Sequence, residues 1–175
     1  DQTAENNQHR LIIGDRGTGK LSVVKYIYEK GTHLLKPFVI LDNDKLADTG
    51  NPYRTSSNGN DDKSLFMQKF HEAKGGVLYI RQIAYLDIHQ QNELLNILTR
   101  QKKDDDFTQV IMSTDVSKDE LQKRLIPKLY NLVIPDCIIL PTLKGKKETI
   151  IFLAGHFLQF ANATLDKRIE TIDPD

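Results

Sequence analysis

GDRGTGK, at residues 14–20, is the stretch that decides the fold of this chain. It fits the pattern G-x-x-x-x-G-K, in which glycines let the backbone wrap a phosphate with its N–H groups. An apolar run, Leu11 to Ile13, precedes the stretch, and a helical pattern from Leu21 to Tyr28 follows it. The pattern therefore has the strand and the helix that a phosphate-binding loop needs, and the helix N-terminus adds partial positive charge.

The stretch predicts a nucleotide-binding site. Lys20 is expected to reach the outer phosphates. Arg16, at the tip of the loop, either contacts phosphate or guanine or is solvated. The alternative for the whole stretch is a glycine-rich turn that binds nothing. The residues expected to bind nucleotide are Gly14, Asp15, Arg16, Gly17, Thr18, Gly19, Lys20 and Leu21.

Strand and helix patterns alternate along the rest of the chain. Short apolar runs predict buried strands at 11–13, 37–41, 77–80, 107–112 and 137–140. Helices are predicted at 18–30, 63–74, 87–101, 118–132 and from Lys146 onward, with Pro127 interrupting the fourth. The segment 46–62 is rich in Gly, Pro, Asn and Ser and is predicted to be a loop.

This alternation predicts an α/β fold of three layers, a parallel sheet with helices on both faces. Ligands of such sheets bind at the carboxyl ends of the strands. The phosphate-binding stretch follows one strand end, and residues 42–44, 81–82 and 113–115 follow three others.

The composition narrows the class of protein. Lys plus Arg equals Asp plus Glu at 24 each, which argues against a surface that coats nucleic acid. The single cysteine, Cys137, lies in an apolar run and is expected in the core of a reduced, cytoplasmic protein. No apolar stretch is long enough to span a membrane. The histidines show no metal-ligand spacing, so no metal is assigned to them.

Three motifs in order resemble the AAA+ domain of bacterial enhancer-binding proteins, the activators of sigma-54 RNA polymerase. The family's phosphate loop GESGTGKE corresponds to GDRGTGKL at 14–21, and its GGTLFLDEI corresponds to GGVLYIRQI at 75–83. Its PPLRERKEDI and LAEHFL correspond to PTLKGKKETI at 141–150 and LAGHFL at 153–158. The resemblance implies a P-loop NTPase (AAA+) fold. A linker is expected at 1–9, the α/β core at 10–143, and the start of a helical lid with a polar tail at 144–175.

The departures from the family pattern fall on its chemistry. The family's carboxylate pair, which holds Mg²⁺ and activates water, is replaced by Arg81 and Gln82. The family's sensor Asn aligns with Asp115, and its arginine fingers align with Ile126 and Leu132. Segment 46–62 also contains nothing like the GAFTGA loop that grips sigma-54. We therefore expect little or no ATP hydrolysis and no remodelling of sigma-54.

Three functions stay open. The first is a sensing and oligomerisation domain of a DNA-binding transcription regulator, which binds ATP or ADP without turnover and Mg²⁺ weakly if at all. The second is a weakly active ATPase with relocated carboxylates. Asp42 and Asp44 are candidates for these, although a helix cap or a turn explains both residues more simply. The third is a structural oligomerisation module with a vestigial phosphate loop.

The resemblance also implies partners. The chain is expected to form a homo-oligomer and to reach RNA polymerase and promoter DNA through other domains, a receiver-like domain before residue 1 and a helix-turn-helix domain after residue 175. Some regulators with eroded motor motifs, among them Vibrio biofilm activators, respond to cyclic di-GMP, whose recognition needs arginines. The candidates by residue type are Arg10, Arg16, Arg54 and Arg81. Arg81 contacts a phosphate or pairs with a nearby carboxylate such as Asp15 or Asp115.

Overall fold

The computed structural model describes residues 8–43, 65–101 and 106–142, and residues 144, 150–151, 154–155, 158, 162, 167 and 169. The chain divides into two units, residues 1–140 and 141–175. The predicted loop 46–62 with Arg54, the residue Asp44, and most of the predicted linker and lid lie outside the described residues. In the second unit, the described residues from Ile150 to Asn162 are helical, as the pattern after Lys146 predicts.

The first unit is built on a five-stranded parallel sheet in the order β2-β3-β4-β1-β5. β1 pairs with β4 and β5, and β3 pairs with β2 and β4. The predicted α/β class, the parallel sheet and its five strands are therefore confirmed. The strands are β1 (Arg10–Ile13), β2 (Phe38–Asp42), β3 (Val77–Arg81), β4 (Gln109–Thr114) and β5 (Cys137–Ile139).

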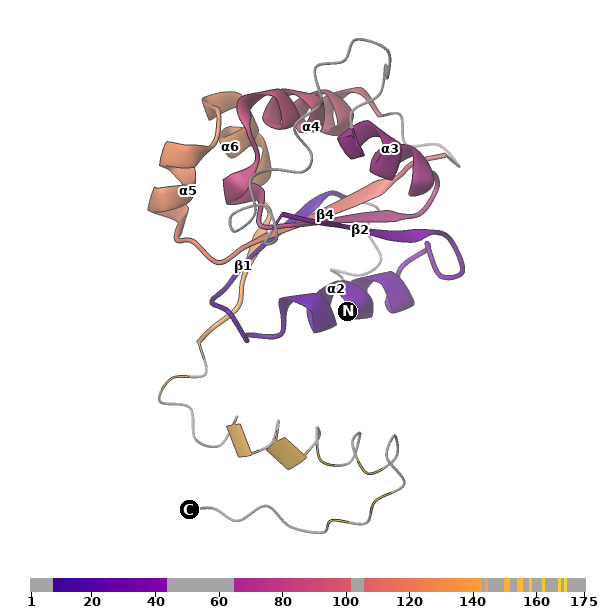
Figure 1. The fold of residues 1–175 in the computed structure, drawn as a ribbon, viewed down its shortest axis with the longest axis vertical. Coiled ribbons are helices and arrows are strands. Elements are labelled where there is room, and N and C mark those ends of the chain that lie inside the picture. The colour runs from indigo at the N-terminus through magenta and orange to yellow at the C-terminus, as the bar shows by residue number, and fades with distance from the viewer. Residues whose placement is uncertain are drawn as a thin grey trace. The chain divides into compact units, whose positions relative to one another are not determined.

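Helices cover both faces of the sheet (Figure 1). One face carries α2 (Lys20–Lys30), and the other carries α3 (Leu65–Glu72), α4 (Ile88–Arg100), α5 (Lys118–Arg124) and α6 (Pro127–Val133). Pro127 separates the last two helices and occupies the first turn of α6, where its missing N–H group costs no hydrogen bond. A short 3-10 turn, η2 (Ile83–Tyr85), which the sequence analysis does not predict, links β3 to α4.

Successive side chains along a strand pack alternately into two separate cores. In β3, Leu78 and Ile80 join the larger core under α3 to α6, whereas Val77 and Tyr79 join the smaller core. This division follows from the period of two in a strand, which sends successive side chains to opposite faces. The smaller core contains Ile12, Val24, Ile27, Val77, Tyr79 and Ile111.

The two outer strands are less buried than the sequence analysis predicts. In β2 only Leu41 is buried, and Ile40 is 41% exposed. In β5, Ile139 is exposed and Cys137, expected in the core, is half-buried. Both strands lie at the ends of the described strand order, so each has one neighbour. Apolar composition does not tell where in a sheet a strand lies.

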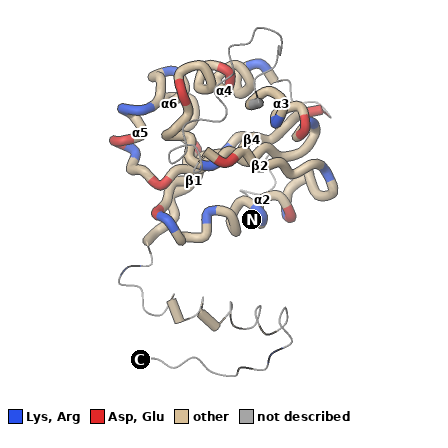
Figure 2. The backbone as a smooth tube through the Cα atoms, in the orientation of Figure 1, with Lys and Arg blue, Asp and Glu red and all other residues tan. Residues whose placement is uncertain are grey.

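Positive and negative residues are mixed over the described part of this unit. Lys, Arg, Asp and Glu are interspersed over the helices of both faces (Figure 2). Among the helices that the structure describes, none combines the length and apolarity needed to cross a bilayer.

Gly76 lies where two backbone segments come too close for a side chain. A Cβ on Gly76 would lie 2.0 Å from the carbonyl oxygen of Pro37. That oxygen accepts a hydrogen bond from the Val77 N–H at 2.8 Å, at the start of the pairing of β2 with β3.

We predict that Gly76→Ala lowers the free energy of unfolding by about 1–3 kcal/mol, because β2 must move away from β3 to admit the methyl group. Urea unfolding followed by circular dichroism measures this change. Gly155→Ala is the control, since its added methyl group meets nothing within 4 Å. Equal unfolding midpoints for wild type and Gly76→Ala would contradict the close approach.

Candidate nucleotide-binding site

The phosphate-binding stretch connects β1 to α2 at the carboxyl edge of the sheet. Gly17 and Gly19 have left-handed backbone angles, with φ of 80° and 83°. A residue with a Cβ adopts this conformation at a cost, so both positions favour glycine. Gly19 is also the N-cap of α2, and as a glycine it has no side chain that could cap the helix. The N–H groups of the first helical turn are therefore left for a ligand at the loop.

Backbone contacts hold the start of the loop against the sheet. The N–H group of Gly14 donates to the carbonyl oxygen of Thr114 in β4 at 3.1 Å. A Cβ on Gly14 would lie 2.8 Å from the Thr18 hydroxyl and 3.0 Å from the Cβ of Leu140. The hydroxyl of Thr18 donates to the Asp15 carbonyl oxygen at 2.8 Å. The loop is thus fixed by its neighbours before any ligand contact.

The Lys20 ammonium lies inside the curve of the loop. Its Nζ donates to the carbonyl oxygens of Gly14 at 2.5 Å and of Asp15 at 2.8 Å. A phosphate oxygen is a stronger acceptor for an ammonium group than a neutral carbonyl. Lys20 is therefore positioned to exchange these contacts for a phosphate.

A cavity of about 420 Å³ opens beside the loop. Three of its lining side chains are cations, Arg16, Lys20 and Arg81, and none of the described residues that line it is a carboxylate. Such a lining favours an anionic ligand. The cavity is lined by Arg16, Gly17, Gly19, Lys20, Leu21, Tyr79, Arg81, Gln82 and Ser113.

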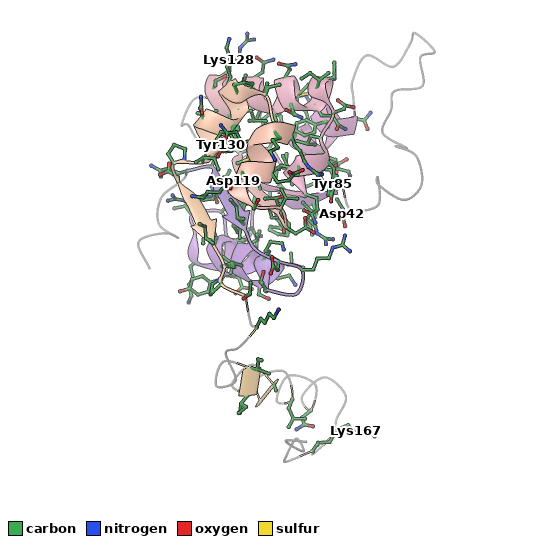
Figure 3. All side chains as sticks on the ribbon, turned by 90° about the vertical axis from the view of Figure 1, so that its left-hand side faces the viewer. Asp42, Tyr85, Asp119, Lys128, Tyr130 and Lys167 are labelled. Carbon is green, nitrogen blue, oxygen red and sulfur yellow. The ribbon has the colours of Figure 1, made fainter. Side chains whose placement is uncertain are left out.

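Arg81 pairs with Asp42 across two neighbouring strands. The two residues end β3 and β2 and are partners in the strand register. The Nη1 of Arg81 lies 2.5 Å from the Oδ2 of Asp42 (the latter residue is labelled in Figure 3). The predicted ion pair of Arg81 with a carboxylate is present, but its partner is Asp42 and not Asp15 or Asp115, the two examples predicted from the sequence. This ion pair was not among the roles predicted for Asp42, which were a cap, a turn or a metal ligand.

Arg16 and Gln82 both contact the end of β4. The Nε of Arg16 lies 3.3 Å from the Oδ2 of Asp115, so Arg16 is not simply solvated, although its side chain is 76% exposed. The Oε1 of Gln82 accepts a hydrogen bond from the Asp115 N–H at 3.1 Å. Gln82 is buried and has a left-handed φ of 56°. Its amide joins two strand ends, and an amide cannot take a proton from water.

Tyr79 and Ser113 also line the cavity. Ser113 belongs to the segment 113–115 that was expected at this edge of the sheet, whereas Tyr79 was not among the predicted site residues. Their hydroxyl oxygens lie 2.9 Å apart, and each residue is 1% exposed. Burial raises the pKa of Tyr79 above its usual value, so its hydroxyl stays protonated at neutral pH. A signal for Tyr79 was available, since residues two apart in a strand share a face and Arg81 was already a candidate.

The structure does not bring all four candidate arginines together. Arg10 begins β1 and is buried, at the opposite end of the strand from the loop. Arg54 lies outside the described residues. Of the four, the cavity gathers Arg16 and Arg81. Within the part of the chain that the structure describes, no three His, Cys, Asp or Glu side chains could hold a metal ion.

Comparison with known proteins shows which family the chain is similar to. The sigma-54 interaction domain matches residues 1–143. The transcriptional activator RocR of Bacillus subtilis is 27% identical over 183 residues, which cover 94% of this chain and 39% of RocR. The chain thus spans about two fifths of the length of that relative.

Two solved structures share the fold. NtrX from Brucella abortus, in complex with ATP, gives a TM-score of 0.79 at 24% identity and covers 99% of this chain and 40% of NtrX. The P-loop NTPase domain of the sigma-54 transport activator from E. coli gives 0.55 at 21% identity and covers 74% of this chain and 93% of that domain. The predicted AAA+ P-loop NTPase fold is confirmed.

We predict that Tyr79→Phe and Ser113→Ala each lower the free energy of unfolding by about 1–2 kcal/mol, because each leaves a buried hydroxyl without this partner. The double variant should cost little more than either single one, since both remove the same hydrogen bond. Urea unfolding of the four proteins of this cycle tests the coupling. Strictly additive losses would show that the two hydroxyl groups do not interact.

Proposed function

This chain belongs to the family of sigma-54 interaction domains, and on that premise we propose that it binds a nucleoside di- or triphosphate without hydrolysing it. In this proposal the chain is the sensing and oligomerisation domain of a DNA-binding transcription regulator, and the bound nucleotide is the signal that it senses. The observation that carries the proposal is the cavity beside the loop, where Lys20, Arg16 and Arg81 gather and where no described lining residue is a carboxylate.

Binding is supported by the loop and by a relative. Gly17 and Gly19 give the loop its curve, and Lys20 already lies inside it. NtrX from Brucella abortus has been solved with ATP and with ADP. Adenine nucleotides are therefore the first ligands that we assign to this chain.

The lack of hydrolysis is proposed from the residues at the strand ends. Arg81 and Gln82 stand where the resemblance expects the carboxylates that hold Mg²⁺ and activate water. Arg81 supplies positive charge to the phosphates directly, and Mg²⁺ binds weakly if at all. At the positions aligned with the arginine fingers, Ile126 precedes α6 and Leu132 lies on it. Neither side chain can stabilise charge on a transferring phosphate.

The wider assignment follows the family. We infer that nucleotide occupancy sets a homo-oligomeric state, and that other domains of a cytoplasmic protein contact RNA polymerase and promoter DNA. We assign the core to residues 10–143 and the start of a helical lid, with a polar tail, to residues 144–175. A response to cyclic di-GMP remains a prediction, and the presence of Arg16 and Arg81 at one cavity supports it.

Isothermal titration of the chain with ATP and ADP, with phosphate release followed in parallel, tests the proposal. We expect binding without phosphate release, and an affinity about 10- to 100-fold lower in Lys20→Ala, since hydrogen bonds to charged groups contribute about 1.5–3 kcal/mol. Lys25→Ala is the matched control, an exposed lysine on the same helix.

Other results separate the alternatives. Steady phosphate release that Lys20→Ala abolishes would make the chain a weakly active ATPase. Failure of ATP, ADP and cyclic di-GMP to bind would leave a structural oligomerisation module. Cyclic di-GMP binding that Lys20→Ala does not change would place that ligand at a different site.

The same titration in the presence of Mg²⁺ tests the role of Arg81. We predict that Mg²⁺ tightens ATP binding by less than about threefold, because the described lining has cations and no oxygen anions to coordinate the metal. The double variant Arg81→Asp/Gln82→Glu should bind ATP more tightly with Mg²⁺ than without it. A tenfold gain from Mg²⁺ in the wild type would contradict the proposed replacement of the metal by Arg81.

A further inference from the structure

Two arginine–carboxylate pairs adjoin the cavity, and a buried glutamine joins them. Arg81 lies 2.5 Å from Asp42, and Arg16 lies 3.3 Å from Asp115. The Oε1 of Gln82, the residue after Arg81, accepts from the N–H of Asp115 at 3.1 Å. We call these five residues the edge chain.

The edge chain follows the strand order of the sheet. Asp42 ends β2, Arg81 ends β3, Asp115 follows β4, and Arg16 lies in the loop after β1. β2, β3, β4 and β1 are neighbours in that order. The contacts therefore cross four strand ends in a continuous line at the carboxyl edge.

The two kinds of charge in the edge chain differ in their relation to the cavity. Both arginines line it, together with Lys20, whereas Asp42 and Asp115 are not among its lining residues. The carboxylates therefore hold the arginines from outside the cavity. A phosphate chain that enters it meets two guanidinium groups that already have carboxylate partners.

We propose that Asp42 and Asp115 are internal competitors for the two arginines that receive the phosphates of the ligand. This inference rests on the proposed nucleotide site. Phosphate is a bidentate acceptor for guanidinium, as carboxylate is, so the ligand takes Arg81 from Asp42 and Arg16 from Asp115. The competition selects a polyphosphate, because one phosphate held by Lys20 cannot replace both carboxylates. Once displaced, the carboxylates at the end of β2 and just after β4 no longer pair with these arginines.

The exposure of the pairs predicts that they differ in strength. The side chains of Arg81 and Asp42 are 38% and 25% exposed, and those of Arg16 and Asp115 are 76% and 15% exposed. The first pair is also the shorter one, at 2.5 Å against 3.3 Å, and has no side chain as exposed as that of Arg16. Solvent screens an exposed ion pair and lowers its contribution. Asp42 is therefore the stronger competitor.

Whether removal of a carboxylate strengthens or weakens ligand binding separates a competitor from a carboxylate that helps to bind the ligand. A carboxylate that held Mg²⁺ or oriented the ligand would be needed for binding, and its removal would weaken the complex. A competitor has the opposite effect, because its removal takes away one acceptor that the phosphate must displace from the arginine.

Titration of the 175-residue chain with ATP and with tripolyphosphate, without Mg²⁺, tests the inference. We expect Asp42→Asn to bind both probes about three- to tenfold more tightly, and Asp115→Asn about two- to threefold more tightly. Asp106→Asn is the matched control, because it removes the same charge next to Lys74, before the start of β4. It should leave both affinities unchanged.

A double-mutant cycle removes the effect of general charge repulsion. In Arg81→Ala, the further change Asp42→Asn should give no gain in affinity. An equal gain in that background, or weaker binding by Asp42→Asn alone, would overturn the inference. Asp115→Asn is an independent test if Asp42→Asn does not fold. An unchanged affinity of Asp115→Asn for both probes would also contradict the inference. If the wild type binds neither probe, the proposed function fails as well; if the wild type binds and no carboxylate variant binds more tightly, this inference fails alone.

Discussion

In a parallel sheet every strand ends at the same edge, and the site of this protein depends on that constraint. The register places Asp42 beside Arg81, and the strand order places the end of β4 between Gln82 and the phosphate loop. Arg16 and Asp115, which are 99 positions apart in the chain, lie 3.3 Å from one another at this edge. The loop itself is fixed to the same edge by the hydrogen bond from Gly14 to β4. The geometry of the cavity is thus a consequence of strand pairing.

The cations that line the cavity decide which ligands it can hold. A site that binds a magnesium nucleotide divides the neutralisation of phosphate charge between the metal and the protein. Here Lys20, Arg16 and Arg81 supply positive charge from the protein. Fixed guanidinium groups bind phosphate strongly but do not activate water, because they cannot accept a proton. The chemistry of the lining therefore supports the proposed recognition of a polyphosphate.

The order and type of the elements were predictable from local patterns. The motif at 14–20 and the apolar runs correctly predicted the five strands and the described helices, because period and breakers act over a few residues. The burial of β2 and β5 was overestimated, because a run of apolar residues has the same pattern in a central strand and in an edge strand. The turn η2 was missed because its start depends on the left-handed Gln82, which no local rule marks.

By itself the sequence determined the phosphate loop, the α/β class and the identity of the residues at the strand ends, since these follow from residue types and short spacings. Only the tertiary structure decided which side chains are in contact. Arg81 pairs with Asp42 rather than with Asp15 or Asp115, and the hydroxyl of Tyr79 is hydrogen-bonded to that of Ser113. Arg10 lies at the end of its strand that is far from Lys20. The reason is physical: an ion pair or hydrogen bond between distant segments forms only at contact distance, and strand order and register set that distance.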